Sequence, residues 1–275
     1  MAVTVRAGLQ STPKVLPPTY FYDGRGSESF DEITRLEEYY PTRAERAILV
    51  ARAAEIAAVT GARTLVELGS GTSEKTRLLL QALRDEGTLT RFVPFDVDPV
   101  VLREAVPVVV SQFPGLEVAP EVGDFKRHLG DVPRRPRPLV AFLGSTIGNL
   151  DPGARASFLA DGRELLGDDG FLLRGQAFTH RAVWDAAHEW IEMRLVSMRD
   201  QWVRVRDLDL QVSFAQGEQM RTEISTKFRR EGVQAELAAA GLELTRWWTD
   251  PAGDFALSLS RSVGSAHGWG AGAEG

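Results

Sequence analysis

Short apolar runs alternate with amphipathic segments through the first two thirds of the chain. Five such runs predict strands, at residues 63–68, 91–97, 116–122, 139–144 and 170–173. Segments of helical periodicity lie before or between them, at residues 42–60, 73–84, 99–110 and 154–166. Strands that are apolar at nearly every position are typical of a parallel sheet covered on both faces. The pattern therefore predicts an α/β fold made of βαβ units.

The predicted helix at 42–60 has recognisable ends. Thr42 and Glu45 have the spacing of a capping box, in which two side chains bond the free amides of the first turn. Gly61 ends the helix, because glycine readily adopts the left-handed conformation that follows a last turn.

The alternation of predicted strands and helices ends after the fifth strand. Extended segments at 194–205, 208–214 and 220–228 precede a helix around 233–240, ended by Gly241, and strands at 243–249 and 255–260. We divide the chain into five parts: 1–60, an arm and helix that contribute to a substrate domain; 61–176, the cofactor-binding domain; 177–230, a shortened substrate-binding part; 231–261, a helix and strands that return to the main sheet; and 262–275, a disordered tail.

Composition and charge narrow the classes of partner. The net charge of −6 argues against nucleic-acid binding, and the basic run Arg134-Arg135-Pro136-Arg137 is interpreted as a solvated loop. We expect no signal peptide and no membrane span, because no run approaches the roughly 18 apolar residues that a span requires. The chain has no cysteine, which excludes disulfides and thiolate metal sites. We expect a cytoplasmic monomer without metal, since the four histidines have no metal-ligand spacing and no apolar heptad is present.

The turn after the first predicted strand, Glu67-Leu68-Gly69-Ser70-Gly71-Thr72-Ser73-Glu74, carries the first candidate chemistry. Its glycines permit a tight turn that a ligand can approach. A dinucleotide fingerprint would need a third glycine where Glu74 stands. A carboxylate at that position repels a pyrophosphate and suits the cationic sulfonium of S-adenosylmethionine. Glu67 is placed to receive the ammonium group of that cofactor, directly or through water.

Acidic residues end the next two predicted strands. Asp96 is placed to accept both ribose hydroxyls, Asp124 to accept the adenine amino group, and Phe125 to pack on the purine. Gly-x-Gly alone is a weak signal, and aspartates at strand ends often only cap the next helix. The three strand ends in order favour a cofactor, because ligands bind outside the carboxyl ends of an open sheet.

The fourth predicted strand ends at Gly144-Ser145-Thr146-Ile147-Gly148-Asn149-Leu150, which allows two interpretations. Its small and amide residues orient an acceptor amine beside the methyl group, or they form a loop in which Asn149 caps the following helix. The spacing favours neither.

Several longer motifs resemble one family. They are Phe21-Tyr22-Asp23, Glu38-Tyr39-Tyr40-Pro41-Thr42-Arg43, the glycine turn continued to Thr76, the run Gly144–Asn149, and Trp247-Trp248-Thr249-Asp250-Pro251. From around Arg6 to around Arg261 the chain resembles the histidine Nα-methyltransferases of ergothioneine biosynthesis. The resemblance implies a Rossmann-like class I methyltransferase sheet with a smaller α+β domain that binds the substrate. It also implies S-adenosylmethionine-dependent trimethylation of the α-amino group of L-histidine to hercynine.

The resemblance and the glycine turn together imply a set of site residues. The cofactor is expected at Glu67, Gly69, Gly71, Lys75, Asp96, Gly123, Asp124 and Phe125. Histidine is expected against Tyr39, Phe30, Gly144, Met193, Glu223 and Ser225, with Tyr22, Thr146 and Asn149 as catalytic residues. Glu223 and Ser225 would read the imidazole nitrogens, and their i and i+2 spacing on a strand puts both on one face. The reaction is an in-line displacement that depends on alignment and desolvation, with protons released to water.

The chain departs from the family pattern after Gly170-Phe171-Leu172-Leu173. The family continues with roughly 40 further residues, including a helix and a substrate-contacting tyrosine, and parallel neighbours need such a long connection. In this chain the segment that begins at Ala177 follows Gln176 without that block. We therefore expect weakened histidine binding with cofactor binding retained. Two alternatives stay open: a methyltransferase of this family with another amine acceptor, and a cofactor-binding scaffold without activity.

Overall fold

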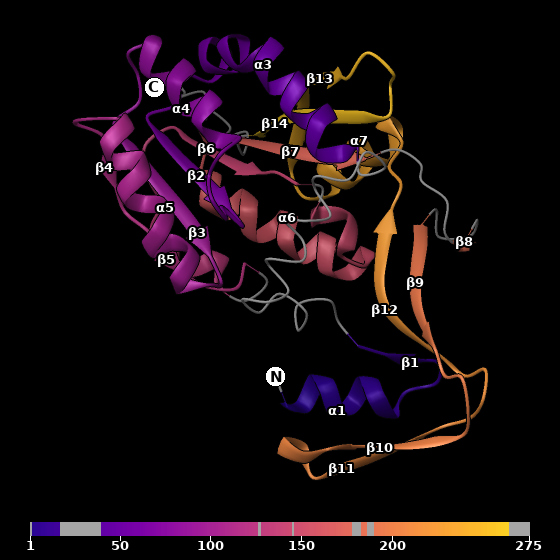
Figure 1. The fold of residues 1–275 in the computed structure, drawn as a ribbon. Coiled ribbons are helices and arrows are strands. Elements are labelled where there is room, and N and C mark those ends of the chain that lie inside the picture. Colours follow the sequence, from indigo (N-terminus) through magenta and orange to yellow (C-terminus); the bar gives the residue numbers. More distant parts are fainter. Residues whose placement is uncertain are drawn as a thin grey trace, which may run out of the picture.

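The central feature of the computed structural model is a sheet with helices on both faces (Figure 1). The structure describes residues 2–16, 40–125, 128–144, 146–177, 183–185 and 190–263. The strands of this sheet are β2 (Thr64–Leu68), β3 (Arg91–Asp96), β4 (Glu117–Val118), β5 (Glu121–Val122), β6 (Pro138–Phe142), β7 (Phe171–Ala177), β13 (Leu242–Thr249) and β14 (Phe255–Ser262). Their order is β13-β14-β7-β6-β2-β3-β4, with β5 also paired to β3.

The pairing directions confirm the predicted α/β fold. β2, β3, β6 and β7 are parallel to their neighbours in this group, whereas β14 is antiparallel to both β7 and β13. The third predicted strand is two short strands, β4 and β5, because Pro120 between them has no amide hydrogen for the ladder. The last strand reaches Ser262, and residues 264–275 of the predicted tail lie outside the described residues.

Two apolar cores fill the space between the sheet and its helices. On one face lie α3 (Pro41–Thr60), α4 (Thr76–Asp85) and α5 (Pro99–Gln112), and on the other α6 (Pro152–Leu166) and α7 (Arg230–Ala239). Successive residues of β2 enter opposite cores, Leu65 the first and Val66 the second. This alternation is why the parallel strands are apolar at most positions.

The start of α3 corrects one prediction. The helix begins at Pro41, whose fixed φ suits a first helical position, and Tyr40 is its N-cap without a side-chain hydrogen bond. The capping box predicted for Thr42 and Glu45 is wrong, because both residues already lie inside the helix. The Glu45 carboxylate is buried and bonds elsewhere. Gly61 ends the helix in the left-handed conformation, as predicted.

A second, smaller sheet extends from the main one (Figure 1). Its order is β1 (Lys14–Val15), β12 (Gln219–Thr226), β9 (Trp190–Val196) and β8 (Val183–Asp185). A hairpin of β10 (Gln201–Val205) and β11 (Leu210–Phe214) packs with α1 (Ala2–Gln10), where Leu9 meets Leu210 and Val212. The N-terminal arm thus adds a strand beside residues 220–221. The five-part domain division stays a prediction, and this pairing is the contact that supports it.

The connection after β7 corrects the reasoning about a crossover. Among the described residues no parallel partner of β7 follows it, and the next described strand, β8, pairs with β9 in the second sheet. The helix before β13 is α7, which follows β12. A shortened segment after Gln176 is therefore compatible with the main sheet, because the chain enters the second sheet at this point.

Candidate functional site

The glycine turn between β2 and α4 opens at the carboxyl edge of the sheet. Gly69 and Gly71 have φ of 70° and 49°, which an L side chain rarely adopts. The amides of Gly69 and Ser70 both donate to the carbonyl oxygen of Phe95, at 2.8 and 3.1 Å. A Cβ added at either glycine would meet no atom within 4 Å. Backbone conformation therefore requires these glycines, and the space above them is open to a ligand.

Asp96, at the end of β3, fixes this turn from the side. One carboxylate oxygen accepts the Gly71 amide at 2.9 Å, and the other accepts the Asp98 amide at 3.0 Å. Asp98, in contrast, caps α5 by accepting the Val100 amide at 2.7 Å. Asp96 thus supports the glycine turn, whereas the helix cap is made by Asp98. The ribose contact of Asp96 stays a prediction, for which its carboxylate keeps free lone pairs.

Glu67 lies under the turn, fully enclosed. It accepts a hydrogen bond from the Thr76 hydroxyl. Burial raises the pKa of Glu67 from 4.5 to about 8, against the opposing effects of the Thr76 hydrogen bond and the nearby Lys75 ammonium. Its Oε2 atom accepts no hydrogen bond of ordinary geometry among the described residues. A cation next to this group would favour its ionised form.

We expect Glu67→Gln to change how stability depends on pH. The unfolded carboxyl loses its proton near pH 4.5 and the folded one near pH 8, so the wild type loses up to about 1.4 kcal/mol of stability per pH unit between these values. Glutamine cannot titrate and removes this slope. The measurement is the free energy of unfolding at pH 5 to 8.5, with exposed Glu74→Gln as control. Parallel curves for wild type and Glu67→Gln would contradict the raised pKa.

The third strand end is held by packing as much as by polar contacts. A Cβ at Gly123 would lie 2.6 Å from the Phe95 ring, so only glycine fits there. The Asp124 amide donates to Nδ1 of His128 at 3.0 Å, which gives this exposed histidine a structural contact. Phe125 packs edge-on against Phe142, with ring centroids 4.9 Å apart. The predicted cofactor contacts of Gly123, Asp124 and Phe125 stay predictions.

The acceptor side begins with η3 (Thr146–Asn149), a short 3-10 turn after β6. Gly148 of this turn lies against the backbone of Thr226, with 3.4 Å from an added Cβ to the carbonyl oxygen. The alternative in which Asn149 caps the next helix is wrong, because Asp151 accepts the Ala154 amide at 2.9 Å. Asp151 is two residues nearer to α6 and has the extended conformation that an N-cap needs.

Asn149 and Glu223 meet at one cavity between η3 and β12. Its volume is about 180 Å³, below the roughly 300–1,000 Å³ of pockets for drug-sized ligands and suited to a smaller molecule. Burial raises the pKa of Glu223. The lining residues are Val15, Leu16, Asn149, Leu150, Asp151, Ala154, Arg221, Thr222, Glu223 and Ile224.

The register of β9 and β12 places Met193 directly opposite Glu223, and Ile191 opposite Ser225. Met193 therefore shares a face with Glu223, as its predicted role requires, and 38% of its surface is exposed. The register shifts between Arg221 and Glu223, which turns these two side chains to opposite faces. The roles of Met193, Glu223 and Ser225 in binding histidine stay predictions.

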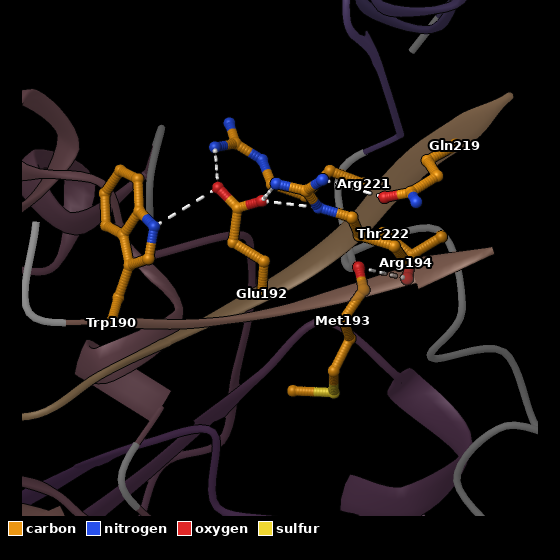
Figure 2. Close-up of polar contacts among 7 residues, drawn as sticks. All are labelled: Trp190, Glu192, Met193, Arg194, Gln219, Arg221 and Thr222. Carbon is orange, nitrogen blue, oxygen red and sulfur yellow. Dashed lines mark hydrogen bonds and ion pairs between the residues drawn. The ribbon is translucent and has the colours of Figure 1, made fainter. Parts of the chain in front are cut away.

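The opposite face of the second sheet holds a charge network around Glu192 (Figure 2). Its carboxylate accepts hydrogen bonds from Arg194, from Arg221 at 3.2 Å, and from the Trp190 indole at 3.2 Å. Burial by itself would raise the pKa of Glu192, but the hydrogen bonds from Arg194 and Arg221 outweigh it and lower the pKa. Figure 2 shows Met193 pointing away from this network. The network joins β9 to β12, and Arg221 belongs both to this network and to the lining of the cavity.

Two residues near the site were not predicted. Lys227 donates to the Ser225 hydroxyl at 2.9 Å, and burial lowers the pKa of Lys227. Glu45 accepts the Gly144 amide at 2.9 Å and forms an ion pair with Lys75. A signal for Glu45 existed in the sequence, because an acidic residue there interrupts the apolar face that Ile48 and Leu49 continue.

The described ranges limit which predicted residues and properties can be compared with the structure. Tyr22, Phe30 and Tyr39 lie outside the described residues. Inside the described ranges, histidine and carboxylate side chains nowhere gather in the groups of three that would hold a metal ion. No helix in the same part of the chain has the length and apolar character needed to cross a membrane.

Comparison with known proteins identifies close relatives. The model of the family described as "histidine-specific methyltransferase, SAM-dependent" matches residues 1–176 and 173–262. The histidine N-alpha-methyltransferase of Mycolicibacterium smegmatis is 51% identical over 298 residues, with 93% of each chain covered. That of Mycobacterium tuberculosis is 50% identical, again with 93% of each chain covered.

Among solved structures, an S-adenosylmethionine-dependent methyltransferase from Clostridium acetobutylicum has a TM-score of 0.56. It is 12% identical, and the match covers 86% of this chain and 99% of that one. At this identity the likeness shows the fold alone.

The same comparisons locate the shortened segment. The alignment to the M. smegmatis protein runs over 298 residues, more than the 275 of this chain, so it includes residues that this chain lacks. The two matched parts of the family model overlap at residues 173–176. A block missing beside Gln176 produces such a split, as the sequence predicts.

Proposed function

Because the chain belongs to the histidine-specific, S-adenosylmethionine-dependent methyltransferases, we propose that it trimethylates the α-amino group of L-histidine to hercynine. The observation that carries this proposal is the cavity shared by Asn149 and Glu223. Glu223 is half-buried, which disfavours its charged form, and an imidazole N–H supplies a hydrogen-bond donor to it. An aliphatic or indole acceptor would not offer the same pattern of two ring nitrogens.

The residues of the glycine turn fit S-adenosylmethionine. Its ammonium group would satisfy the enclosed Glu67 carboxyl, and its body would occupy the open space above Gly69 and Gly71. Asp96 would hold the ribose while it keeps the turn in shape through the Gly71 amide. When bound, S-adenosylmethionine supplies the electrophilic methyl group.

The residues of this chain contribute alignment more than proton transfer. Glu223 fixes the imidazole, and Asn149 holds the α-amine so that its lone pair faces the cofactor edge of the sheet. Fixing both ends of the acceptor lowers the entropic part of the barrier. The protons that the amine loses between methylations pass to water.

Mass spectrometry tests the proposed reaction. Incubation of the protein with S-adenosylmethionine and L-histidine should give mono-, di- and trimethylhistidine in succession. Histamine, which has the ring and the amine but no carboxylate, and tryptophan, which lacks the imidazole, serve as comparison acceptors. Methylation of tryptophan but not of histidine would identify a family member with another acceptor. Binding of S-adenosylhomocysteine without methylation of any acceptor would identify a scaffold.

The shortened segment beside Gln176 leads to a separate prediction. We expect histidine affinity to be weakened by about tenfold or more relative to the mycobacterial relatives, because side chains of the missing block no longer cover the acceptor. Affinity for S-adenosylhomocysteine should stay in their range, since β2, β3 and the glycine turn are complete. Isothermal titration of both ligands measures this. Histidine affinity equal to that of the relatives would contradict it.

We also propose that the protein acts as a cytoplasmic monomer. The absence of cysteine is compatible with a reducing compartment, and histidine is a soluble metabolite. Light scattering after size exclusion tests the assembly state. A doubled mass would contradict the monomer.

A further inference from the structure

Glu45 is the most enclosed carboxylate near the site. It lies in the second turn of α3, its side chain is fully buried, and its neighbours Ile48 and Leu49 belong to the apolar core. Both of its oxygens lie close to the Gly144 amide, at 2.9 and 3.1 Å, and Oε2 pairs with the Lys75 ammonium. One carboxylate therefore contacts the α4 side of the glycine turn and the end of β6.

The surrounding backbone leaves room for this carboxylate. A Cβ at Gly175 on β7 would lie 2.1 Å from Oε1 of Glu45, so any larger residue there would displace the carboxylate. Gly144 has a φ of 78°, at which its amide leaves the ladder of β6 and points to Glu45. Gly175 thus leaves the space that this carboxylate occupies, and Gly144 supplies the amide that donates to it.

The contacts of Glu45 reach both halves of the proposed site. Lys75 is expected to contact the cofactor, and Gly144 is expected to contact histidine. A hydrocarbon side chain would be lower in free energy at a position facing an apolar core, because a buried charge carries a desolvation cost. The charge is therefore explained by what it holds, an ammonium group and a strand-end amide, and not by the packing of α3.

We propose that Glu45 is a positioning residue that fixes Lys75 and Gly144 together and so couples the cofactor half of the site to the acceptor half. The proposal rests on the proposed function for the contact of Lys75 with the cofactor and of Gly144 with the acceptor. The substitution Glu45→Gln removes the charge and keeps the shape of the side chain, so it tests the positioning role without changing the packing of α3. In Glu45→Gln the amide oxygen still accepts the Gly144 N–H, but the amide NH₂ faces the Lys75 ammonium and displaces it toward water.

The experiment compares cofactor binding with folding. For Glu45→Gln we expect the Kd of S-adenosylhomocysteine to rise about tenfold, with a melting temperature close to that of the wild type. In a Lys75→Met background the same substitution should change this Kd by less than about twofold, because its effect passes through Lys75. Gly175→Ala should reproduce the loss by displacing the carboxylate. Glu55→Gln on the same helix and Gly162→Ala, where an added Cβ meets no atom within 4 Å, are the matched controls.

Two results would overturn the proposal. One is wild-type affinity for S-adenosylhomocysteine in Glu45→Gln. The other is a lowered melting temperature with a loss of affinity that is equally large in the Lys75→Met background, which would indicate a structural role. The readout needs no turnover, so a failure of histidine methylation with a positive binding result would reject the proposed acceptor and leave the role of Glu45 standing.

Discussion

Replacing Glu223 by alanine should lower kcat/KM for histidine by about a hundredfold, with the affinity for S-adenosylhomocysteine unchanged. The cavity would lose the carboxylate that β12 contributes to its lining, on the same cavity as Asn149. The imidazole N–H would then be desolvated without a partner, which costs more than the hydrogen bond itself contributes. Glu223→Gln should lose less, about tenfold, because its amide oxygen still accepts a hydrogen bond.

Steady-state kinetics with histidine and a separate titration of S-adenosylhomocysteine measure this effect. Glu231→Ala, an exposed carboxylate in the first turn of α7, is the control and should behave like the wild type. A fall of less than about threefold for Glu223→Ala would show that the cavity does not bind the imidazole. Loss of cofactor affinity in the same variant would indicate misfolding of β12.

Asp96→Ala should raise the Kd of S-adenosylhomocysteine by about a hundredfold. This substitution removes the acceptor of two backbone amides, those of Gly71 and Asp98, and the predicted partner of the ribose. The glycine turn would lose the contact that holds Gly71 in its left-handed conformation. The KM for histidine at saturating cofactor should change little, because Asp96 lies at the end of β3, two strands from β6.

Asp98→Ala is the matched control for Asp96→Ala. It removes the cap of α5 and should cost about 1 kcal/mol of stability without changing cofactor affinity. Titration and thermal unfolding of both variants separate the two roles. If Asp98→Ala weakened S-adenosylhomocysteine as much as Asp96→Ala, the effect would be one of local folding and the ribose contact would be contradicted.

The fold was readable from the sequence because its signals are local. A strand buried on both faces is apolar at most of its positions, and β2, β3 and β6 follow the predicted runs within two residues. Glycine turns and helix ends are likewise set by single residues, such as Gly61. The prediction failed where one residue had two local uses, as with Glu45, whose capping-box spacing concealed a buried ion pair.

The site was readable only in part. The glycine turn and the aspartates that end the strands are local signals, and they pointed to a cofactor at the carboxyl edge of the sheet. The face on which each side chain of β12 lies depends on the register shift between Arg221 and Glu223 and on pairing with β9. The cavity that joins Asn149 to Glu223 also depends on η3 lying against Thr226. Such contacts join residues far apart in sequence and leave no periodic trace.

The sequence by itself determined the α/β architecture, the glycine turn and the resemblance to histidine methyltransferases, because backbone conformation and burial period act on neighbouring residues. Only the tertiary structure decided which aspartate supports the turn, which caps a helix, and where Glu45 places its charge. A carboxylate suits each of these roles equally well in an extended chain. Its partner is chosen when α3, β6 and the glycine turn pack together, and the enclosed space then allows one arrangement.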